Sequence, residues 1–223
     1  MDREVFFDSD SGSAILSNSL LNPYGAIGLR GNPFVAEGGR GVPKELWVDR
    51  GWSKAPVAKG RQFVQVMGEK GFGKTSHLKH WRGQTGGPYC YYPPGLGRLR
   101  FPAIAPITYW DEADRIPLPW LFLALAWSRV VGNTVVVGTH RDLRSVAVPL
   151  GFKVAHIDLP PLDAEMLMKW AAHRIQAARL PGAQCSLALS QEQAGAIAQQ
   201  SQGSWRTAGT YLHIWAADAA STP

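Results

Sequence analysis

Five short apolar stretches alternate with segments of helical pattern over the first 160 residues of the chain. They are rich in valine, isoleucine and aromatic residues and are bounded by Gly, Pro, Asn or Asp, a pattern typical of buried strands. The stretches are RQFVQVM (61–67), YCYY (89–92), PITYWDEAD (106–114), NTVVVGTH (133–140) and FKVAHIDLP (152–160). Strands that alternate with helical segments predict a mainly parallel five-stranded sheet flanked by helices.

After the Pro160-Pro161 pair the pattern becomes wholly helical. Apolar residues recur at helical spacing in segments 162–180 and 204–215. Between these segments, Ser190 and Gln193 have the spacing of a capping box, which marks the start of a helix. A small all-helical unit is therefore expected after the α/β unit.

The residues before the first strand divide into two parts. The first lacks sustained periodicity and is interpreted as a loose tail or docking arm, whereas the second is rich in Gly and Pro and predicts a loop-dominated lead-in. The expected organisation is a tail (1–22), an α/β domain (23–160) and a helical domain (161–223).

The composition is that of a folded globular protein, with 45% hydrophobic and 18% charged residues. Lysine and arginine outnumber the acids by 23 to 17, so the net charge of +6 permits binding to nucleic acid without requiring it. Cys90 and Cys185 lack the spacing of a disulfide framework or a zinc site. The acidic N-terminus does not resemble a signal peptide and no apolar run reaches membrane-spanning length, so a cytoplasmic protein without membrane insertion is expected.

The stretch VMGEKGFGKTSHL (66–78) contains the pattern G-x-x-x-x-G-K-[ST] between a predicted strand and a predicted helix. This context predicts a phosphate-binding loop, because glycines let backbone N–H groups converge on phosphate oxygens at a helix N-terminus. Lys74 is expected to reach the β- and γ-phosphates, and the Thr75 hydroxyl is expected to bind Mg²⁺. The predicted nucleotide-binding residues are Gly68, Glu69, Lys70, Gly71, Phe72, Gly73, Lys74, Thr75 and Ser76.

The segment ITYWDEAD (107–114) places two carboxylates at the end of an apolar strand. A phosphate-binding loop requires a carboxylate on a neighbouring strand for the metal and a group that orients water for hydrolysis. Asp111 is predicted to hold Mg²⁺ from its second coordination shell, and Glu112 is predicted to orient the attacking water. Acidic pairs also occur at ordinary helix starts, and Asp114 is interpreted as a helix N-cap or a partner of Arg115.

These residues resemble the AAA+ ATPases. GEKGFGKT is similar to their Walker A motif and ITYWDE to their Walker B motif. VVVGTH lies where sensor 1 ends the next strand, and GSWRTAGTYL is similar to the sensor 2 motif of the helical lid. The resemblance implies ATP hydrolysis with Mg²⁺, a lid over the nucleotide, and catalytic roles for Thr139 and Arg206 beside Lys74 and Glu112.

Other features of the resemblance concern the subgroup and the assembly. YGAIGLRGNPF and IDLPPLDAEML are similar to segments of the ATPases of transposition target selection and of related secretion ATPases. Sensor 1 is commonly Asn in the family, so here Thr139 or His140 must serve. The resemblance also implies a ring or filament in which an arginine reaches a neighbouring subunit's nucleotide, with Arg141 and Arg144 as candidates.

Two functions from different classes remain open on the sequence. The first is an oligomeric AAA+ ATPase acting on nucleic acid or protein, in which Arg98 and Arg100 contact phosphates while Tyr92 and Phe101 stack on bases. These aromatic side chains could instead fill gaps in the core beside a proline-stiffened connector. The second function is a slow nucleotide-dependent switch that docks a protein partner through residues 1–22. A small-molecule kinase fits less well, because the acidic pair resembles water activation.

Overall fold

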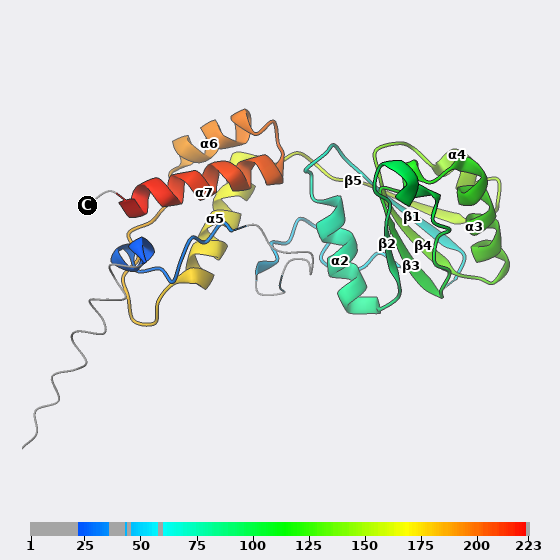
Figure 1. Cartoon of the computed structure of the whole chain (residues 1–223), viewed down its shortest axis with the longest axis horizontal. Helices are drawn as coiled ribbons and strands as arrows, with labels where there is room; N and C mark the ends of the chain where they lie inside the picture. Colours follow the sequence, from blue (N-terminus) through cyan, green and yellow to red (C-terminus); the bar gives the residue numbers. More distant parts are fainter. Residues whose placement is uncertain (1–21, 36–42, 44–45, 58–59, 222–223) are drawn as a thin grey trace, which may run out of the picture.

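The computed structural model describes residues 22–35, 43, 46–57 and 60–221 (Figure 1). The predicted tail, residues 1–22, lies outside this part of the chain except for its last residue. Within the described ranges, no helix is long and apolar enough to cross a membrane.

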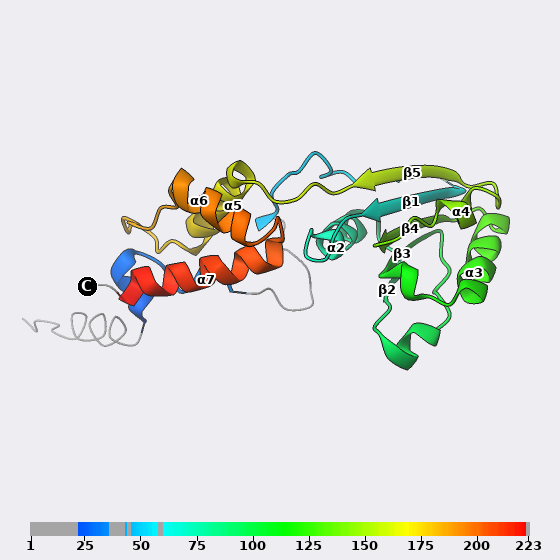
Figure 2. The ribbon, with the colours of Figure 1, turned by 90° about the horizontal axis from the view of Figure 1, so that it is seen from above.

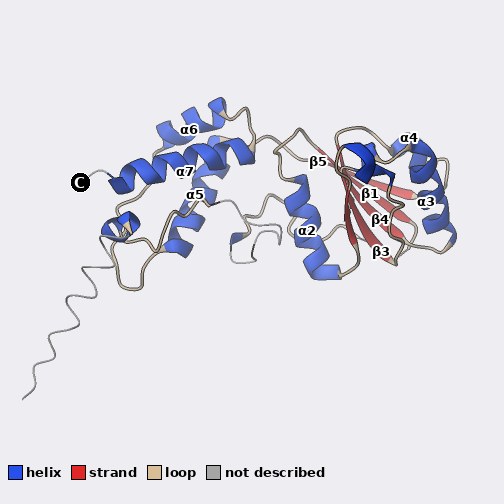
Figure 3. Cartoon of the chain, in the orientation of Figure 1, coloured by secondary structure: helices blue, strands red, loops and turns tan. Residues whose placement is uncertain are grey.

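Five parallel strands form one sheet in the order β2-β3-β4-β1-β5, as the alternating pattern predicted (Figure 3). The strands are β1 (Gln62–Met67), β2 (Tyr89–Tyr91), β3 (Ile107–Asp111), β4 (Thr134–Thr139) and β5 (Lys153–Asp158). Because every pairing is parallel, all five strands end at the same edge of the sheet. In this register Asp111, the last residue of β3, pairs with Gly138 of β4.

Helices cover both faces of the sheet, which explains why all six residues of β4 are buried. On one face, Val64 and Val136 pack against α2 (Lys74–Thr85) through Leu78 and Trp81. On the other face, residues such as Phe63 pack against α3 (Leu118–Val130) and the single turn α4 (Arg144–Ala147). Short 3-10 helices complete this part of the chain: η1 (Pro23–Ile27) precedes β1, η3 (Gly95–Leu99) lies between β2 and β3, and η4 (Ala113–Arg115) lies between β3 and α3.

Helix α3 is apolar around most of its circumference. Leu121 and Leu125 are buried against the sheet, whereas Phe122, Trp127 and Val130 point outward with 48%, 62% and 78% of their surface exposed. A helix that is apolar on all sides is normally covered, and exposed apolar patches mark interaction sites. The outer face of α3 therefore has the composition of an interface.

The C-terminal helices form a separate group beyond the carboxyl ends of the strands (Figures 1 and 2). They are α5 (Ala164–Ala178), α6 (Gln191–Gln200) and α7 (Trp205–Ser221). The predicted capping box is present at the start of α6, where the Gln193 N–H donates to the Ser190 hydroxyl over 3.1 Å and the Ser190 N–H donates to the Gln193 side chain over 3.0 Å. The sequence thus specifies both the helical content and one of its boundaries.

The segment 23–35, which the sequence analysis grouped with the α/β domain, packs on these C-terminal helices. Leu29 and Phe34 are buried in the helical core, and the Arg30 N–H donates to the carbonyl of Ala178 over 2.9 Å. Such contacts join residues far apart in sequence, so local composition cannot reveal them. We propose that this segment forms part of the helical domain.

The second part of the lead-in, residues 46–57, lies against α2. Trp47 stacks on the His80 ring with the ring centroids 3.8 Å apart. The Trp81 indole N–H donates to the carbonyl of Trp52 over 2.7 Å. The lead-in is thereby fixed beside the helix that follows the glycine-rich loop.

His77 lies on the same helix and is 1% exposed. Its Nδ1 contacts the Gly73 carbonyl at 3.0 Å, and its Nε2 has no hydrogen-bond partner among the described residues. Burial lowers the pKa of His77 to about 4, because a proton on Nε2 would be desolvated without an acceptor.

This shift predicts a loss of stability in mild acid. The unfolded chain takes up a proton near pH 6.5 and the folded chain near 4, so the free energy of unfolding falls as the pH drops through that window. His77→Asn keeps a donor to Gly73 but cannot titrate. We expect denaturant titrations to show the wild-type protein losing about 3 kcal/mol more than His77→Asn between pH 7 and 4. Parallel pH profiles of the two proteins would contradict this account.

Candidate functional site

The glycine-rich loop connects the carboxyl end of β1 to the first turn of α2. Gly71 and Gly73 have φ angles of 92° and 91°, a region that favours glycine. A Cβ atom on Gly71 would also overlap the Ser204 side chain of the helical domain. The loop therefore presents backbone N–H groups at a helix N-terminus, an arrangement that binds phosphate.

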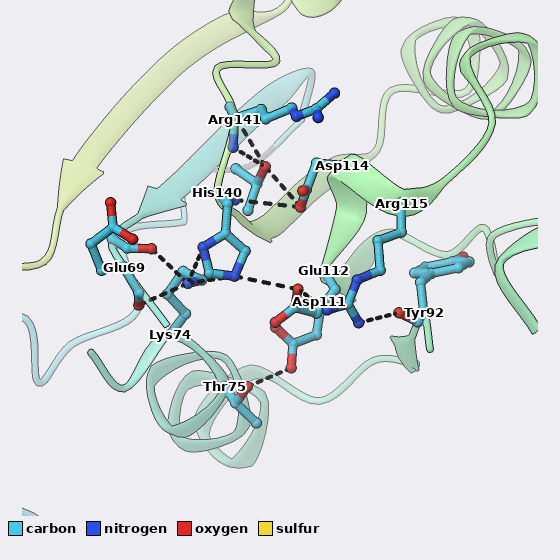
Figure 4. Close-up of polar contacts among 12 residues, drawn as sticks. Glu69, Lys74, Thr75, Tyr92, Asp111, Glu112, Asp114, Arg115, His140 and Arg141 are labelled. Carbon is cyan, nitrogen blue, oxygen red and sulfur yellow. Dashed lines mark hydrogen bonds and ion pairs between the residues drawn. The ribbon is translucent and has the colours of Figure 1, made fainter. Parts of the chain in front are cut away.

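Lys74, the first residue of α2, is 5% exposed and points into this loop (Figure 4). Its ammonium group donates to the carbonyl oxygens of Gly68 over 2.6 Å and Glu69 over 3.2 Å. Burial lowers the pKa of Lys74, and nearby carboxylates, Glu112 first, partly offset that effect. Such a desolvated cation interacts strongly with an anion that enters the loop.

Asp111 and Thr75 lie together at the end of β3 and the start of α2. The Thr75 hydroxyl donates to Oδ2 of Asp111 over 2.7 Å, and the Tyr89 hydroxyl donates to the same oxygen over 2.6 Å. Asp111 is fully buried, and its Oδ1 has no hydrogen-bond partner among the described residues. Burial and the Asp111 charge both raise the pKa of Tyr89, which keeps that hydroxyl protonated.

The donor set of Asp111 and Thr75 fits Mg²⁺, which takes oxygen ligands from one or two protein groups together with substrate phosphates and water. Over the described residues, no group of three or more His, Cys, Asp or Glu side chains gathers to form an all-protein metal site. A metal at this position would therefore be held largely by the nucleotide.

Glu112 follows Asp111 in a left-handed backbone conformation, with φ 58° and ψ 43°. A non-glycine residue in this region is strained by about 1–3 kcal/mol, and such strain concentrates at functional sites. The carboxylate Oε2 lies 3.0 Å from Arg115 and 3.4 Å from His140. The partner of Arg115 is therefore Glu112, not the expected Asp114, which does not cap a helix either.

The end of β4 places His140, not Thr139, next to the loop. The buried Thr139 hydroxyl donates to the Arg141 carbonyl over 2.8 Å and accepts from the Arg141 N–H over 3.0 Å. The His140 ring nitrogens instead lie 3.3 Å from the Lys74 ammonium. Of the two residues that the sequence offered for the sensor 1 position, His140 thus contacts the candidate site and Thr139 holds the turn that follows it.

A cavity of about 940 Å³ joins the glycine-rich loop to the helical domain. Arg206, in the first turn of α7, lines it together with Lys70, Thr75 and Ser76. The Trp205 N–H donates to the carbonyl of Gly71 over 3.0 Å, so the start of α7 is bonded directly to the loop. The structure thus brings Arg206 to the cavity that holds the predicted phosphate-binding residues.

Arg50 was not singled out from the sequence. Its guanidinium donates to the carbonyl of Phe72 in the loop and to that of Pro160 before the helical domain, over 2.8 Å in each case. The same group lies 4.7 Å from the Trp205 ring centroid, and burial lowers its pKa to about 10. One side chain therefore connects the loop, the segment at Pro160 and the helical domain.

The two candidates for an intersubunit arginine differ in their surroundings. Arg144 forms an exposed ion pair with Asp142 at 2.7 Å, and its hydrogen bonds hold the pKa of that carboxyl well below its usual range. Arg141 instead extends away from the cluster around Lys74 (Figure 4). The structure of one chain therefore assigns neither residue to a neighbouring nucleotide.

The connector after β2 differs from the expectation in one respect. Tyr92 is fully buried and cannot stack on a base, so its side chain fills the core. Phe101 is 46% exposed and packs edge-on against Trp120. Arg98 and Arg100 remain exposed on this connector.

Comparison with known proteins gives a likeness of fold alone. Neither a protein-family model nor a curated protein matches the sequence. Cdc6p from Pyrobaculum aerophilum superposes with a TM-score of 0.50 at 14% identity, covering 98% of this chain and 64% of that one. The fold is that of the AAA+ P-loop ATPases.

Two further solved structures are less similar. The RuvB Holliday junction branch migration motor of Thermotoga maritima gives a TM-score of 0.48 at 17% identity, covering 68% of this chain and 53% of that one. The Orc1 protein of Aeropyrum pernix in complex with DNA gives 0.47 at 18% identity, covering 71% and 54%. This chain thus spans about half to two thirds of the length of these proteins.

The geometry of Lys74 predicts that nucleotide binding depends on its charge. Lys74→Ala is expected to abolish the rise in melting temperature that ADP or a slowly hydrolysed ATP analogue produces with Mg²⁺, because the loop loses its cation. Lys153→Ala, which removes an exposed lysine at the start of β5, serves as the charge-matched control. An unchanged thermal shift in Lys74→Ala would refute the phosphate-loop assignment.

The contacts of Arg50 predict energetic coupling between the loop and the helical domain. Arg50→Lys keeps the charge but loses the planar fork, so we expect nucleotide affinity to fall about tenfold. A double-mutant cycle with Trp205→Leu, read by the dissociation constant of a fluorescent ADP analogue, should be non-additive by at least about 0.5 kcal/mol. Additive effects would show that the two residues act independently.

Proposed function

We propose that this chain is a Mg²⁺-dependent AAA+ ATPase that works as an oligomer on a nucleic-acid or protein partner. The observation that carries the proposal is the meeting of Lys74, Asp111 and Glu112 at one sheet edge, where Arg206 lines the same cavity as Lys74. A buried cation, a metal-binding carboxylate and a second carboxylate are the groups that phosphoryl transfer to water requires.

Each residue has a distinct role in this proposal. Lys74 turns from the carbonyls of Gly68 and Glu69 to the β- and γ-phosphates. Thr75 and Asp111 would hold Mg²⁺, and the bound metal would neutralise charge on the phosphate oxygens. Glu112 orients the water whose oxygen attacks the γ-phosphorus as the bond to the β–γ bridging oxygen breaks.

Two further side chains complete the proposed site. His140, 3.3 Å from the Lys74 ammonium, takes the position expected of a sensor at the end of β4. Arg206 contacts the phosphates from the helical lid, so closing of the lid and nucleotide binding favour each other.

The proposed assembly is a ring or filament of identical subunits. The outward apolar residues of α3 supply a surface that a second subunit can cover, and either Arg141 or Arg144 supplies a cation to its nucleotide. Segments 24–34 and 157–167 support a relation to the ATPases of transposition target selection or secretion. The net charge of +6 is compatible with DNA as the partner.

A nucleotide-dependent switch is the second candidate, and the surroundings of Glu112 favour it. Glu112 is held by both Arg115 and His140, at 3.0 Å and 3.4 Å, and a carboxylate engaged in this way orients water poorly. In the switch, ATP and ADP would alter docking to a protein partner while turnover stayed slow.

The two candidates differ in the expected effect of Glu112→Gln. For an ATPase, this change preserves binding of a slowly hydrolysed ATP analogue but lowers steady-state phosphate release at least ~100-fold, because the amide no longer draws a proton from water. Glu165→Gln, on the exposed face of α5, is the matched control. Unchanged phosphate release in Glu112→Gln would remove Glu112 from the water-orienting role, and a wild-type protein without turnover would favour the switch.

The proposed assembly predicts a nucleotide-dependent change in mass. Light scattering on a sizing column should show a ring or filament with Mg²⁺ and a slowly hydrolysed ATP analogue, and duplex DNA should co-elute with it. Trp127→Lys on α3 should reduce assembly, whereas Ile214→Lys, which replaces another exposed apolar residue on α7, should not. A monomer under all conditions would contradict the oligomeric account.

A further inference from the structure

A second, smaller cavity of about 390 Å³ lies beside Glu112, where η3, η4 and the turn after β4 meet. Three arginines face it, one from each of these elements. The lining residues are Arg98, Asp114, Arg115, Ile116, Pro117 and Arg141. Arg115 also lines the larger cavity of the candidate ATP site, so the two cavities share a wall.

The charges around this smaller cavity do not balance. Its one carboxylate, Asp114, lies 3.3 Å from the Thr139 hydroxyl and 3.4 Å from the His140 N–H, contacts that hold the turn after β4. Arg115 is paired with Glu112 at 3.0 Å. Within the described part of the chain, no ion pair is formed by Arg98 or Arg141.

The Arg141 backbone and the Arg115 guanidinium are held in place without a ligand. Both the N–H and the carbonyl of Arg141 are bonded to the Thr139 hydroxyl, at 3.0 Å and 2.8 Å. The Arg115 guanidinium donates to the Tyr92 carbonyl over 3.0 Å, which orients its planar fork. A guanidinium that is already oriented, as that of Arg115 is, loses little conformational entropy when it binds an anion.

We propose that this cavity binds a phosphate group, either of a nucleic-acid backbone or free in solution. Planar arginine forks match phosphate oxygens in bidentate pairs. The connector between β2 and β3 favours an anion as well, because residues 92–106 include Arg98 and Arg100 and no aspartate or glutamate. The exposed Arg100 on the same connector extends the basic surface away from the cavity.

A phosphate in this cavity can affect the candidate catalytic carboxylate, Glu112, through one side chain. Arg115 borders both cavities and is the cation closest to Glu112. A phosphate that draws the Arg115 guanidinium weakens its hold on Glu112 and frees that carboxylate to orient water. This coupling rests on the proposed ATPase function, whereas the binding of phosphate does not.

The binding test uses the full chain saturated with Mg²⁺ and ADP, so that the glycine-rich loop does not compete for phosphates. Fluorescence anisotropy measures binding of a labelled 20-bp duplex at several salt concentrations. Arg98→Ala and Arg141→Ala should each weaken binding about 5- to 20-fold and reduce the slope of log K against log salt by about 1. Arg82→Ala, in the last turn of α2, removes the same charge outside the cavity and should have less effect.

A second arm identifies the source of the phosphate. Binding of inorganic phosphate to the same ADP-saturated proteins is measured by ³¹P NMR. Loss of duplex binding in the Arg98 and Arg141 variants assigns the cavity to a nucleic-acid backbone, and loss of phosphate binding alone assigns it to free phosphate. If both variants match Arg82→Ala in both arms, the cavity is not a phosphate site.

The coupling is tested separately by phosphate release from ATP. Whichever ligand binds should raise the turnover of the wild-type protein at least threefold and leave that of Arg98→Ala unchanged. If binding depends on the arginines but neither the wild type nor any variant hydrolyses ATP, the proposed function is refuted and the phosphate site is retained. Turnover that Arg98→Ala stimulates as fully as the wild type would refute the coupling.

Discussion

The parallel pairing of the five strands is the constraint on which the candidate site depends. Parallel strands end at one edge, so this edge collects the residues that follow β1, β3 and β4. The Thr75 hydroxyl lies 2.7 Å from the carboxylate of Asp111, although the two residues are 36 positions apart in sequence. The Lys74 ammonium likewise lies 3.3 Å from the ring of His140, which is 66 positions further along the chain. A register slip of one residue would reverse the faces of each strand and separate these groups.

The charged side chains at this edge contact other groups of the protein. Lys74 is bonded to carbonyls of its own loop, and Glu112 is held by Arg115 and His140. In the proposed function, each of these contacts is exchanged for a contact to phosphate or water. Arg50 links the helical domain to this edge, because it donates to the carbonyl of Phe72 in the loop and to that of Pro160 before the helical domain.

The sequence predicted those features that depend on local chemistry. Apolar stretches gave the five strands, and the glycine pattern with Lys74 and Thr75 gave the loop, because both follow from residues close together in the chain. Arg50 was missed because its acceptors lie 22 and 110 residues away, and no local pattern encodes such a contact. Thr139 and His140 are adjacent, and only the turn geometry decides which side chain faces Lys74.

Binding of ATP together with Mg²⁺ at this sheet edge can be measured by isothermal titration calorimetry. A slowly hydrolysed ATP analogue would be titrated into the purified protein with and without Mg²⁺. We expect one site per chain and an affinity that Mg²⁺ raises at least tenfold, because Thr75 and Asp111 would hold the metal only together with the nucleotide phosphates. No binding heat in either titration, or an affinity that does not depend on Mg²⁺, would show that this edge does not bind ATP with Mg²⁺.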